Sequence, residues 1–307
     1  MPILEVENLS ISFQQYTAGL KQKNVQVISS LNVELEAGEI LAVVGASGSG
    51  KSLLAHAILG ILPENANVSG TIKYDGETLT KVRQEALRGK EIALIPQSVN
   101  YLDPLMRVGN QVRTSVKEGD AVASQRAVFE RLHLDKKVEN MYPFQLSGGM
   151  ARRTLLSTAI VTEADVIIAD EPTPGLDPVV MKEALSHFRE FADKGCAVML
   201  ITHDIESALT IADKIAVFYA GTTVEIAPVA DFAGKGEALR HPYTKALWKA
   251  LPQNDFIPIA GSQPHPDALP PGCLFAPRCP IVTSECSEAQ PKMRDLRNGM
   301  VRCIHAT

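Results

Sequence analysis

Glycines, serines and a lysine follow one another in a short segment near residue 50, and together they can surround a chain of phosphates. The segment reads Gly45, Ala46, Ser47, Gly48, Ser49, Gly50, Lys51, Ser52 and Leu53. Because glycine has no Cβ, the backbone can turn several N–H groups inward around a triphosphate. The lysine adds positive charge for the outer phosphates, and the last serine hydroxyl can ligate Mg²⁺. We therefore expect these residues to bind the phosphates of a nucleotide.

The flanking residues indicate which elements hold this loop. Residues 40–44 form a short apolar run typical of a buried strand, and residues 52–62 fit a helix whose N-terminus points at the phosphates. A flexible glycine–serine turn is the alternative, but it explains neither the strand nor the helix. The pattern predicts strand, loop and helix in succession.

Two carboxylates end a second apolar run. Asp170 and Glu171 directly follow residues 166–169. Hydrolysis of a phosphoanhydride needs a metal that neutralises charge and a group that orients or deprotonates water. Asp170 is expected to be the Mg²⁺ partner. Glu171 should point the other way, because successive strand residues face opposite sides, and it would then be the general base. A solvated acidic strand end is the alternative.

Further polar segments complete an ordered set of motifs. After the glycine loop come Gln97 behind an apolar run, Leu146-Ser147-Gly148-Gly149-Met150 at a helix start, the carboxylate pair, Gly175-Leu176-Asp177, and His203 behind the apolar run 197–202. With these motifs the sequence resembles the ATP-binding subunits of ABC transporters over about residues 1–250. The resemblance implies ATP and Mg²⁺ as ligands and ATP hydrolysis as the activity.

The resemblance also implies individual roles. The Gln97 amide would touch both Mg²⁺ and the attacking water, and its loop would communicate with membrane subunits. His203 would contact the γ-phosphate. Taken alone, these two residues would be an ordinary surface glutamine and a strand-end histidine. We predict Glu171, His203 and Gln97 as catalytic residues, and Ser52, Gln97 and Asp170 as the residues that bind Mg²⁺.

A second anion site is expected at the start of a helix. There the Ser147 hydroxyl and the free N–H groups of Gly148 and Gly149 can face a phosphate. The resemblance implies that these residues contact ATP bound to another subunit, with Asp177 at the interface. Dimerisation would then complete each catalytic site.

An aromatic ring for the adenine is expected upstream of the phosphate loop. Phe13 fits this position, and Tyr16 is a weaker candidate. Either ring could instead pack in the core.

Some positions depart from the commonest ABC pattern. Met150 replaces the usual glutamine, Arg152 stands where glutamine is common, and Pro174-Gly175 replace Thr-Ala. Because the base, metal-binding and phosphate-binding groups are intact, a competent ATPase site is expected.

The order of elements predicts the fold class. Strand–helix–strand alternation over residues 166–202 demands a parallel sheet with right-handed crossovers, and Ala220-Gly221 joins a closing hairpin. We predict an α/β fold of the ABC-type P-loop NTPases. It would have a mixed central sheet, an antiparallel β subdomain, an inserted α-helical subdomain at about residues 100–162 and a small cysteine-containing C-terminal extension. The nucleotide-binding domain is assigned to residues 1–254, and the proline-rich extension to residues 255–307.

Three segments resemble one branch of the transporters, the oligopeptide/dipeptide/nickel importers. They are residues 88–93, residues 241–244 and residues 273–280. Peptide is the first expectation for the cargo, and nickel or a metal chelate is the alternative. The resemblance implies a second homologous ATPase subunit in a hetero- or homodimer, two integral membrane permease subunits and an extracytoplasmic solute-binding protein.

The C-terminal segment holds four of the five cysteines. Cys273, Cys279, Cys286 and Cys303 lack the C-x₂-C spacing of ordinary zinc ribbons, and thiolate-rich sites select iron–sulfur clusters or zinc. By resemblance to peptide importers with such a tail, a [4Fe–4S] cluster is expected. Zinc, or reduced cysteines without metal, are the alternatives. Cys196 is expected in the core.

Composition bounds the possible partners. The net charge is −5, and no cluster of five or more Lys/Arg residues is present, which argues against a nucleic-acid surface. No apolar stretch reaches the eighteen or so residues of a membrane span. We expect the protein at the cytoplasmic face of the cell membrane, attached through its permease partners. A soluble ABC ATPase acting on nucleic acid or the ribosome is a less favoured alternative.

Overall fold

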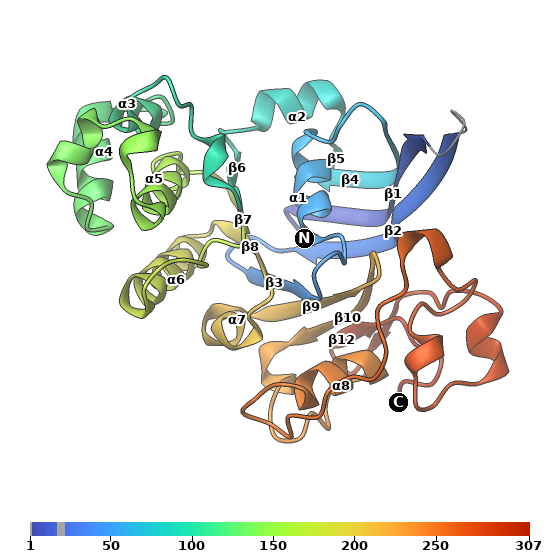
Figure 1. The fold of residues 1–307 in the computed structure, drawn as a ribbon. Helices are drawn as coiled ribbons and strands as arrows, with labels where there is room; N and C mark the ends of the chain where they lie inside the picture. The colour runs from blue at the N-terminus through green and yellow to red at the C-terminus, as the bar shows by residue number, and fades with distance from the viewer. Residues whose placement is uncertain (1, 17–21) are drawn as a thin grey trace.

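Two β-sheets form the centre of the computed structural model, which describes residues 2–16 and 22–307 (Figure 1). The strands are β1 (Leu4–Tyr16), β2 (Gln22–Leu35), β3 (Ile40–Gly45), β4 (Ala66–Tyr74), β5 (Glu77–Thr78), β6 (Ile92–Ile95), β7 (Val166–Asp170), β8 (Ala197–Thr202), β9 (Lys214–Tyr219), β10 (Thr222–Pro228), β11 (Arg294–Leu296) and β12 (Gly299–Val301). The larger sheet is mixed and has the order β11-β12-β10-β9-β3-β8-β7-β6. The smaller sheet is antiparallel and has the order β2-β1-β4-β5. The predicted fold class is confirmed.

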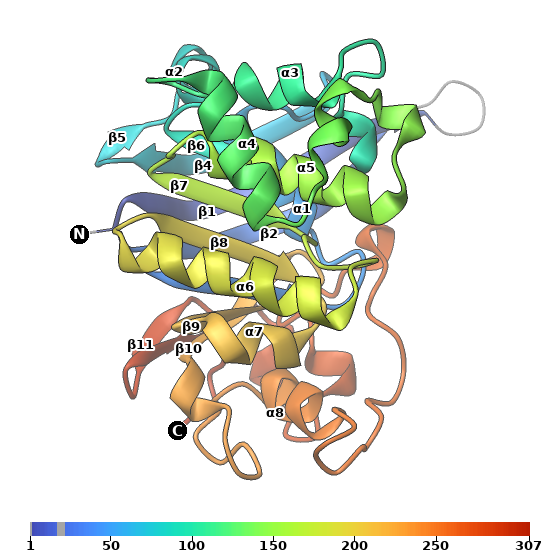
Figure 2. The same cartoon turned by 90° about the vertical axis from the view of Figure 1, so that its left-hand side faces the viewer.

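Helices cover the larger sheet and extend to one side of it. They are α1 (Lys51–Leu59), α2 (Lys81–Leu87), α3 (Val108–Arg113), α4 (Ala121–Arg131), α5 (Gly148–Ile160), α6 (Pro178–Asp193), α7 (Ile205–Ile211) and α8 (Pro242–Lys249). Short 3-10 turns connect several of these helices. Figure 2 shows α6 and α7 lying across the larger sheet, with α3, α4 and α5 grouped at its far end. In the described chain, none of the helices is both long and apolar enough to cross a bilayer.

The largest hydrophobic core lies between the two sheets. Leu41 and Val43 of β3 belong to it, as does Leu54 of α1. Ala42 and Val44, the alternate residues of β3, pack in a different core on the other face. Because successive strand residues face opposite sides, β3 is buried on both faces, as is typical of a parallel strand. The loop after β3 therefore begins from a rigid support.

The parallel strands bring the predicted motifs to one edge. Strands β6, β7, β8, β3 and β9 are neighbours and run in the same direction. The carboxyl ends of parallel strands share one edge of a sheet, where α/β proteins bind their ligands. The segments that leave β3, β6, β7 and β8 there contain, respectively, the glycine loop, Gln97, Glu171 and His203.

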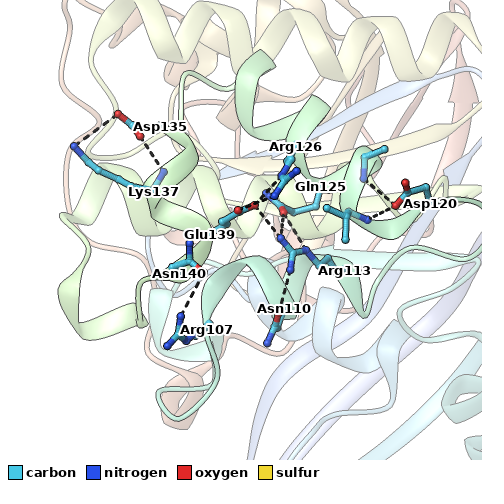
Figure 3. Close-up of polar contacts among 12 residues, drawn as sticks. Arg107, Asn110, Arg113, Asp120, Gln125, Arg126, Asp135, Lys137, Glu139 and Asn140 are labelled. Carbon is cyan, nitrogen blue, oxygen red and sulfur yellow. Dashed lines mark hydrogen bonds and ion pairs between the residues drawn. The ribbon is translucent and has the colours of Figure 1, made fainter.

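The described elements between β6 and β7 are all helical, as expected for the insertion. A buried polar network holds them together (Figure 3). Glu139 forms ion pairs with Arg113 (2.8 Å) of α3 and Arg126 (3.0 Å) of α4. Gln125 of α4 accepts hydrogen bonds from both Nε (3.1 Å) and Nη2 (2.8 Å) of Arg113. The hydrogen bond from Arg126 holds the pKa of the Glu139 carboxyl below its ordinary value. These contacts fix the helices against one another, including the segment that leads into α5.

The C-terminal extension adds strands to the larger sheet, which the sequence pattern did not predict. β12 pairs with β10, so that Glu225 lies opposite Val301. Glu225 is fully buried and accepts hydrogen bonds from the backbone N–H groups of Arg240 (2.8 Å) and His241 (2.8 Å). Arg302 donates to the Ser30 carbonyl on β2. The extension is therefore bonded to both sheets.

Candidate active site

The glycine loop connects β3 to α1 as predicted. Gly48 and Gly50 have φ values of 77° and 94°, in the left-handed region that favours glycine. At Gly45 a Cβ atom would lie 2.5 Å from the Phe218 carbonyl oxygen, so only glycine fits there. Ser49 is buried, and its hydroxyl has no hydrogen-bond partner among the described residues. A polar, buried and unpaired group in this loop fits a phosphate ligand.

Lys51 is the cation of this loop and begins α1. Its side chain is buried, and Nζ donates to the carbonyl oxygens of Gly45 (2.8 Å) and Ala46 (3.2 Å). Burial lowers the Lys51 pKa, while the negative charges of Glu171 and Asp170 act in the opposite direction. A phosphate anion would supply the counter-charge that the two carbonyls cannot.

Asp170 and Ser52 form a group of oxygen ligands. Asp170 is 3% exposed, and burial raises the pKa of its carboxyl group, although a hydrogen bond from Ser52 acts in the opposite direction. The Asp170 Oδ1 atom is buried and has no hydrogen-bond partner within the described residues. An unpaired carboxylate oxygen beside a hydroxyl suits a hard cation such as Mg²⁺. Gln97 is exposed just beyond β6, and its contact with the metal stays a prediction.

Glu171 and His203 are brought together by β7 and β8. Oε1 of Glu171 lies 2.8 Å from Nδ1 of His203. Oε2 is buried and has no partner in the described chain. An ionised carboxylate only accepts hydrogen bonds, so the Nδ1–H group donates to Oε1. Oε2 is therefore the oxygen that remains available to accept a proton from water.

The predicted reason for the direction of Glu171 was wrong. β7 ends at Asp170, and Glu171 has a φ of 48°. Its side chain is directed by a left-handed backbone turn after the strand, not by the alternation of strand residues.

The second anion site has the expected local geometry. Ser147 is the N-cap of α5, and its hydroxyl accepts a hydrogen bond from the Met150 N–H (3.3 Å). Asp177 caps α6 and accepts hydrogen bonds from the N–H groups of two following residues. A Cβ atom on Gly149 would lie 3.8 Å from the Gly175 carbonyl oxygen, so these two loops approach each other. Contact with ATP on a second subunit stays a prediction for Ser147, Gly148, Gly149 and Asp177.

The two candidate rings for the adenine differ in exposure. Phe13 of β1 lies opposite Val25 and Ala66 and packs, half-buried, against the main hydrophobic core. Tyr16 is 71% exposed, and its hydroxyl accepts a hydrogen bond from the Gln22 side chain (3.1 Å). The Phe13 ring makes the core contact foreseen as its alternative role. Its stacking on adenine stays a prediction.

The four cysteines of the extension converge on one cavity. Cys273, Cys279, Cys286 and Cys303 all line it, and its volume of about 10 Å³ leaves room for about one water molecule. Burial raises the pKa of the Cys273 thiol, and negative charge on the other three thiols would raise it further. Within the described residues, no three His, Cys, Asp or Glu side chains are already placed to hold one metal ion.

Two further residues that could bear on metal binding are Cys196 and His305. Cys196 is half-buried against a hydrophobic core, and burial raises its pKa to about 12. His305 lines the cysteine cavity, and its Nε2 atom lies 2.8 Å from the Thr283 hydroxyl.

An aromatic cluster that the sequence pattern did not reveal connects this cavity with the phosphate loop. Phe275 lines the cavity, and its ring centroid lies 5.4 Å from that of Tyr243 and 5.3 Å from that of Tyr219. Burial raises the Tyr243 pKa to about 12, while a hydrogen bond with the Ala46 backbone acts in the opposite direction. In the sequence, the segments that contain Tyr243 and Phe275 indicate only a resemblance to the importer branch.

Fold and site together define a P-loop nucleotide-binding protein with an inserted helical region. Two family models match the chain. The model described as "ABC transporter" matches residues 28–174, and that described as "Oligopeptide/dipeptide transporter, C-terminal region" matches residues 224–286.

Curated relatives agree with these models. The chain is 36% identical to the oligopeptide transport ATP-binding protein OppD of Mycobacterium bovis, over 96% of this chain and 50% of that protein. It is 33% identical to a putative peptide import ATP-binding protein of Brucella melitensis, over 98% of this chain and 94% of that protein. It is 34% identical to the oligopeptide transport ATP-binding protein AppD of Bacillus subtilis, over 98% of this chain and 96% of that protein. The chain thus spans half the length of the mycobacterial relative and nearly all of the other two.

Solved structures show the same fold. A dimeric ATP-binding cassette bound to ADP and Pi superposes with a TM-score of 0.64 at 21% identity, covering 74% of this chain and 98% of that one. An ATP-binding subunit of an ABC transporter superposes with a TM-score of 0.63 at 25% identity, covering 75% of this chain and 91% of that one. The chain belongs to the ABC transporter family of ATP-binding proteins, in the branch defined by the oligopeptide/dipeptide transporter C-terminal region.

Proposed function

We propose that this protein hydrolyses ATP and thereby powers the import of peptides across the cytoplasmic membrane through partner permease subunits. The observation that carries the proposal is the joint presence of an intact ATP site and the peptide-importer C-terminal region. The printed names of the relatives, which refer to oligopeptide transport or peptide import, favour peptide over nickel or a metal chelate as cargo.

The residues of the site suggest how hydrolysis proceeds. Lys51 and the loop N–H groups would hold the outer phosphates, and Ser52 and Asp170 would hold Mg²⁺. When bound, Mg²⁺ neutralises charge on the phosphate oxygens. Glu171 accepts a proton from water at its free Oε2 atom while Oε1 holds the His203 ring in place. With Nδ1 carrying the proton towards Glu171, the Nε2 atom of the exposed His203 ring would be the one to contact the γ-phosphate.

Two partner surfaces support the proposal. The helix start at Ser147 offers a hydroxyl and N–H groups to ATP on a second, homologous subunit. Beside the segment after β6, a cavity of about 370 Å³ is lined by Pro96 and Tyr101, among others. Tyr101, which lines it, is 54% exposed, and Leu105, next in the chain to the lining residue Met106, is 87% exposed. Exposed apolar side chains around a hollow favour a protein partner. A permease subunit bound there would hold the protein at the membrane surface, and a solute-binding protein would deliver peptide from outside.

The proposal is tested by reconstituting the full chain with its second ATPase subunit and permease subunits in liposomes. Peptide presented by the solute-binding protein should stimulate ATP hydrolysis severalfold and drive peptide uptake. The Leu105→Asp variant should lose co-purification with the permease, because a charge replaces an exposed apolar contact. Val68→Asp is the matched control on the antiparallel sheet, where Val68 is 51% exposed, and it should co-purify as the wild type does. Stimulation by a nickel chelate but not by peptide would contradict the assigned cargo.

We further propose that the extension binds a [4Fe–4S] cluster. Four thiols face one cavity, and the Cys273 N–H donates to the Cys286 carbonyl (2.7 Å), which ties two of the ligand segments together. The donor set suits such a cluster, which is held by four thiolates. Four thiolates can also hold one zinc ion, so zinc is the alternative that the metal content of the purified protein must exclude.

Anaerobic purification tests the cluster. We expect a brown protein with a broad thiolate-to-iron absorbance band and about four irons per chain. Cys279→Ser should lower the iron content, whereas Cys196→Ser, at a cysteine outside the cavity, should leave it unchanged. A colourless protein with four freely titratable thiols, or one with stoichiometric zinc, would contradict this part of the proposal.

A further inference from the structure

Arg152 joins three segments that meet at the active site. It lies on α5, in the first turns after the second anion site. Its Nη1 atom donates to the Glu171 carbonyl oxygen (2.6 Å), and its Nη2 atom donates to the Gln97 carbonyl oxygen (3.0 Å). One guanidinium group thus bonds the inserted helical region to both the general base and the predicted metal-contacting glutamine. The fork of donors on arginine lets two nitrogens of one side chain each bond a different carbonyl, a geometry that the single nitrogen of lysine does not share.

The carbonyl group that Arg152 bonds belongs to Glu171, and the backbone conformation of Glu171 directs the catalytic carboxylate. Glu171 has a φ of 48°, an uncommon backbone conformation for a residue with a side chain. Its N–H group donates to the Ile201 carbonyl on β8 (2.8 Å), and its carbonyl accepts from Arg152. The N–H group of Glu171 is therefore bonded to strand β8, and its carbonyl group is bonded to helix α5. A strained conformation persists only where its surroundings hold it in this way.

The neighbouring Arg153 has no such role. Its Nε atom donates to the Gly149 carbonyl (3.3 Å), and its Nη1 atom donates to the carbonyls of Leu132 (3.2 Å) and His133 (2.9 Å). All of these acceptors lie within the inserted helical region. Two adjacent arginines of equal charge thus bond to different regions, one to the catalytic segments and one within the insertion.

We propose that Arg152 is a positioning residue for hydrolysis, which aligns Glu171 and Gln97 only while α5 is seated against the ends of β6 and β7. This inference rests on the proposed ATPase function and deepens it. A movement of α5 away from the sheet would break both hydrogen bonds and release the base from its working position. The placement of the second anion site would in this way control the rate at the first.

The test compares Arg152→Gln with the matched control Arg153→Gln in the full transporter complex. Glutamine is shorter than arginine and has one nitrogen in place of the guanidinium fork, so it should not keep both hydrogen bonds. A misplaced reacting group costs roughly 10- to 100-fold in rate, so Arg152→Gln should lower kcat by that factor with the Kd for ATP within about twofold of wild type. Arg152→Lys should be intermediate, and Arg153→Gln should keep kcat within about twofold.

Amide hydrogen exchange gives a readout that does not depend on turnover. In ATP-free protein, Arg152→Gln should speed exchange in peptides that cover residues 97–101 and residues 171–177, and Arg153→Gln should do so only around residues 132–134. The proposal is overturned if Arg152→Gln leaves exchange unchanged, if it keeps the wild-type kcat, or if both variants lower kcat equally. If wild-type protein does not hydrolyse ATP, the function proposed above fails, and the exchange measurement still decides whether Arg152 holds the catalytic segments.

Discussion

Replacing Glu171 with glutamine is expected to lower the kcat for ATP hydrolysis by about a hundredfold or more, because a positioned general base contributes at least this factor. The amide can still bond to His203 at the position of Oε1, but it cannot take a proton from water. The phosphate and Mg²⁺ ligands lie on other residues, so ATP should bind with nearly unchanged affinity. Phosphate release and equilibrium binding of labelled ATP, measured on the same preparation, separate the two effects.

Glu183→Gln is the matched control for this prediction. Glu183 lies on α6, pairs with the exposed His133 (3.1 Å) and has no assigned role in the site. Its replacement should leave both the kcat and the ATP affinity unchanged. A Glu171→Gln protein that hydrolyses ATP at the wild-type rate would show that another group deprotonates the water.

The sequence was sufficient to predict the elements that carry the phosphate site. Residues 40–44 were expected as a strand, and β3 runs from Ile40 to Gly45. The helix after the loop was expected to reach residue 62, but α1 ends at Leu59, because Gly60 adopts a φ of 66° and caps it. The apolar pattern continues past this point, so periodicity alone overestimates the length of the helix.

The hairpin at Ala220-Gly221 was also predictable, because a turn signal between two apolar runs is a local feature. β9 and β10 pair there, and the two turn residues have φ values of 48° and 83°. The addition of β12 to β10 was not predictable in this way. β11 and β12 are three residues long and lie in a proline-rich segment, and their pairing joins residues far apart in the chain.

The contact between Glu171 and His203 could be identified only from the tertiary structure. Glu171 and His203 could each be placed at a strand end, but their 2.8 Å contact depends on β7 and β8 being neighbours and on the left-handed turn at Glu171. The bonds of Arg152 to two backbone carbonyls leave no trace in a sequence pattern, since any residue offers a carbonyl. The sequence showed only that arginine was unusual at this position.

The second large effect is expected at Lys51. A hydrogen bond to a charged group contributes about 1.5–3 kcal/mol, so Lys51→Met should raise the Kd for ATP roughly 10- to 100-fold. Methionine keeps an unbranched apolar side chain but removes the charge that faces the phosphates. Calorimetric titration with ATP and Mg²⁺ measures the change. Lys81→Met, at an exposed lysine at the start of α2, is the control and should bind ATP as the wild type does.

The same substitution should not destabilise the ATP-free protein. Burial lowers the Lys51 pKa, so the folded state disfavours the charged amine, and this cost is fully present at pH 7. It is relieved only as the pH rises through the lowered pKa towards the ordinary value of 10.5. Urea unfolding should therefore show Lys51→Met to be at least as stable as wild type at pH 7, with the difference shrinking at pH 10. A variant that unfolds more easily at pH 7 and still binds ATP would show that Lys51 supports the loop instead of the nucleotide.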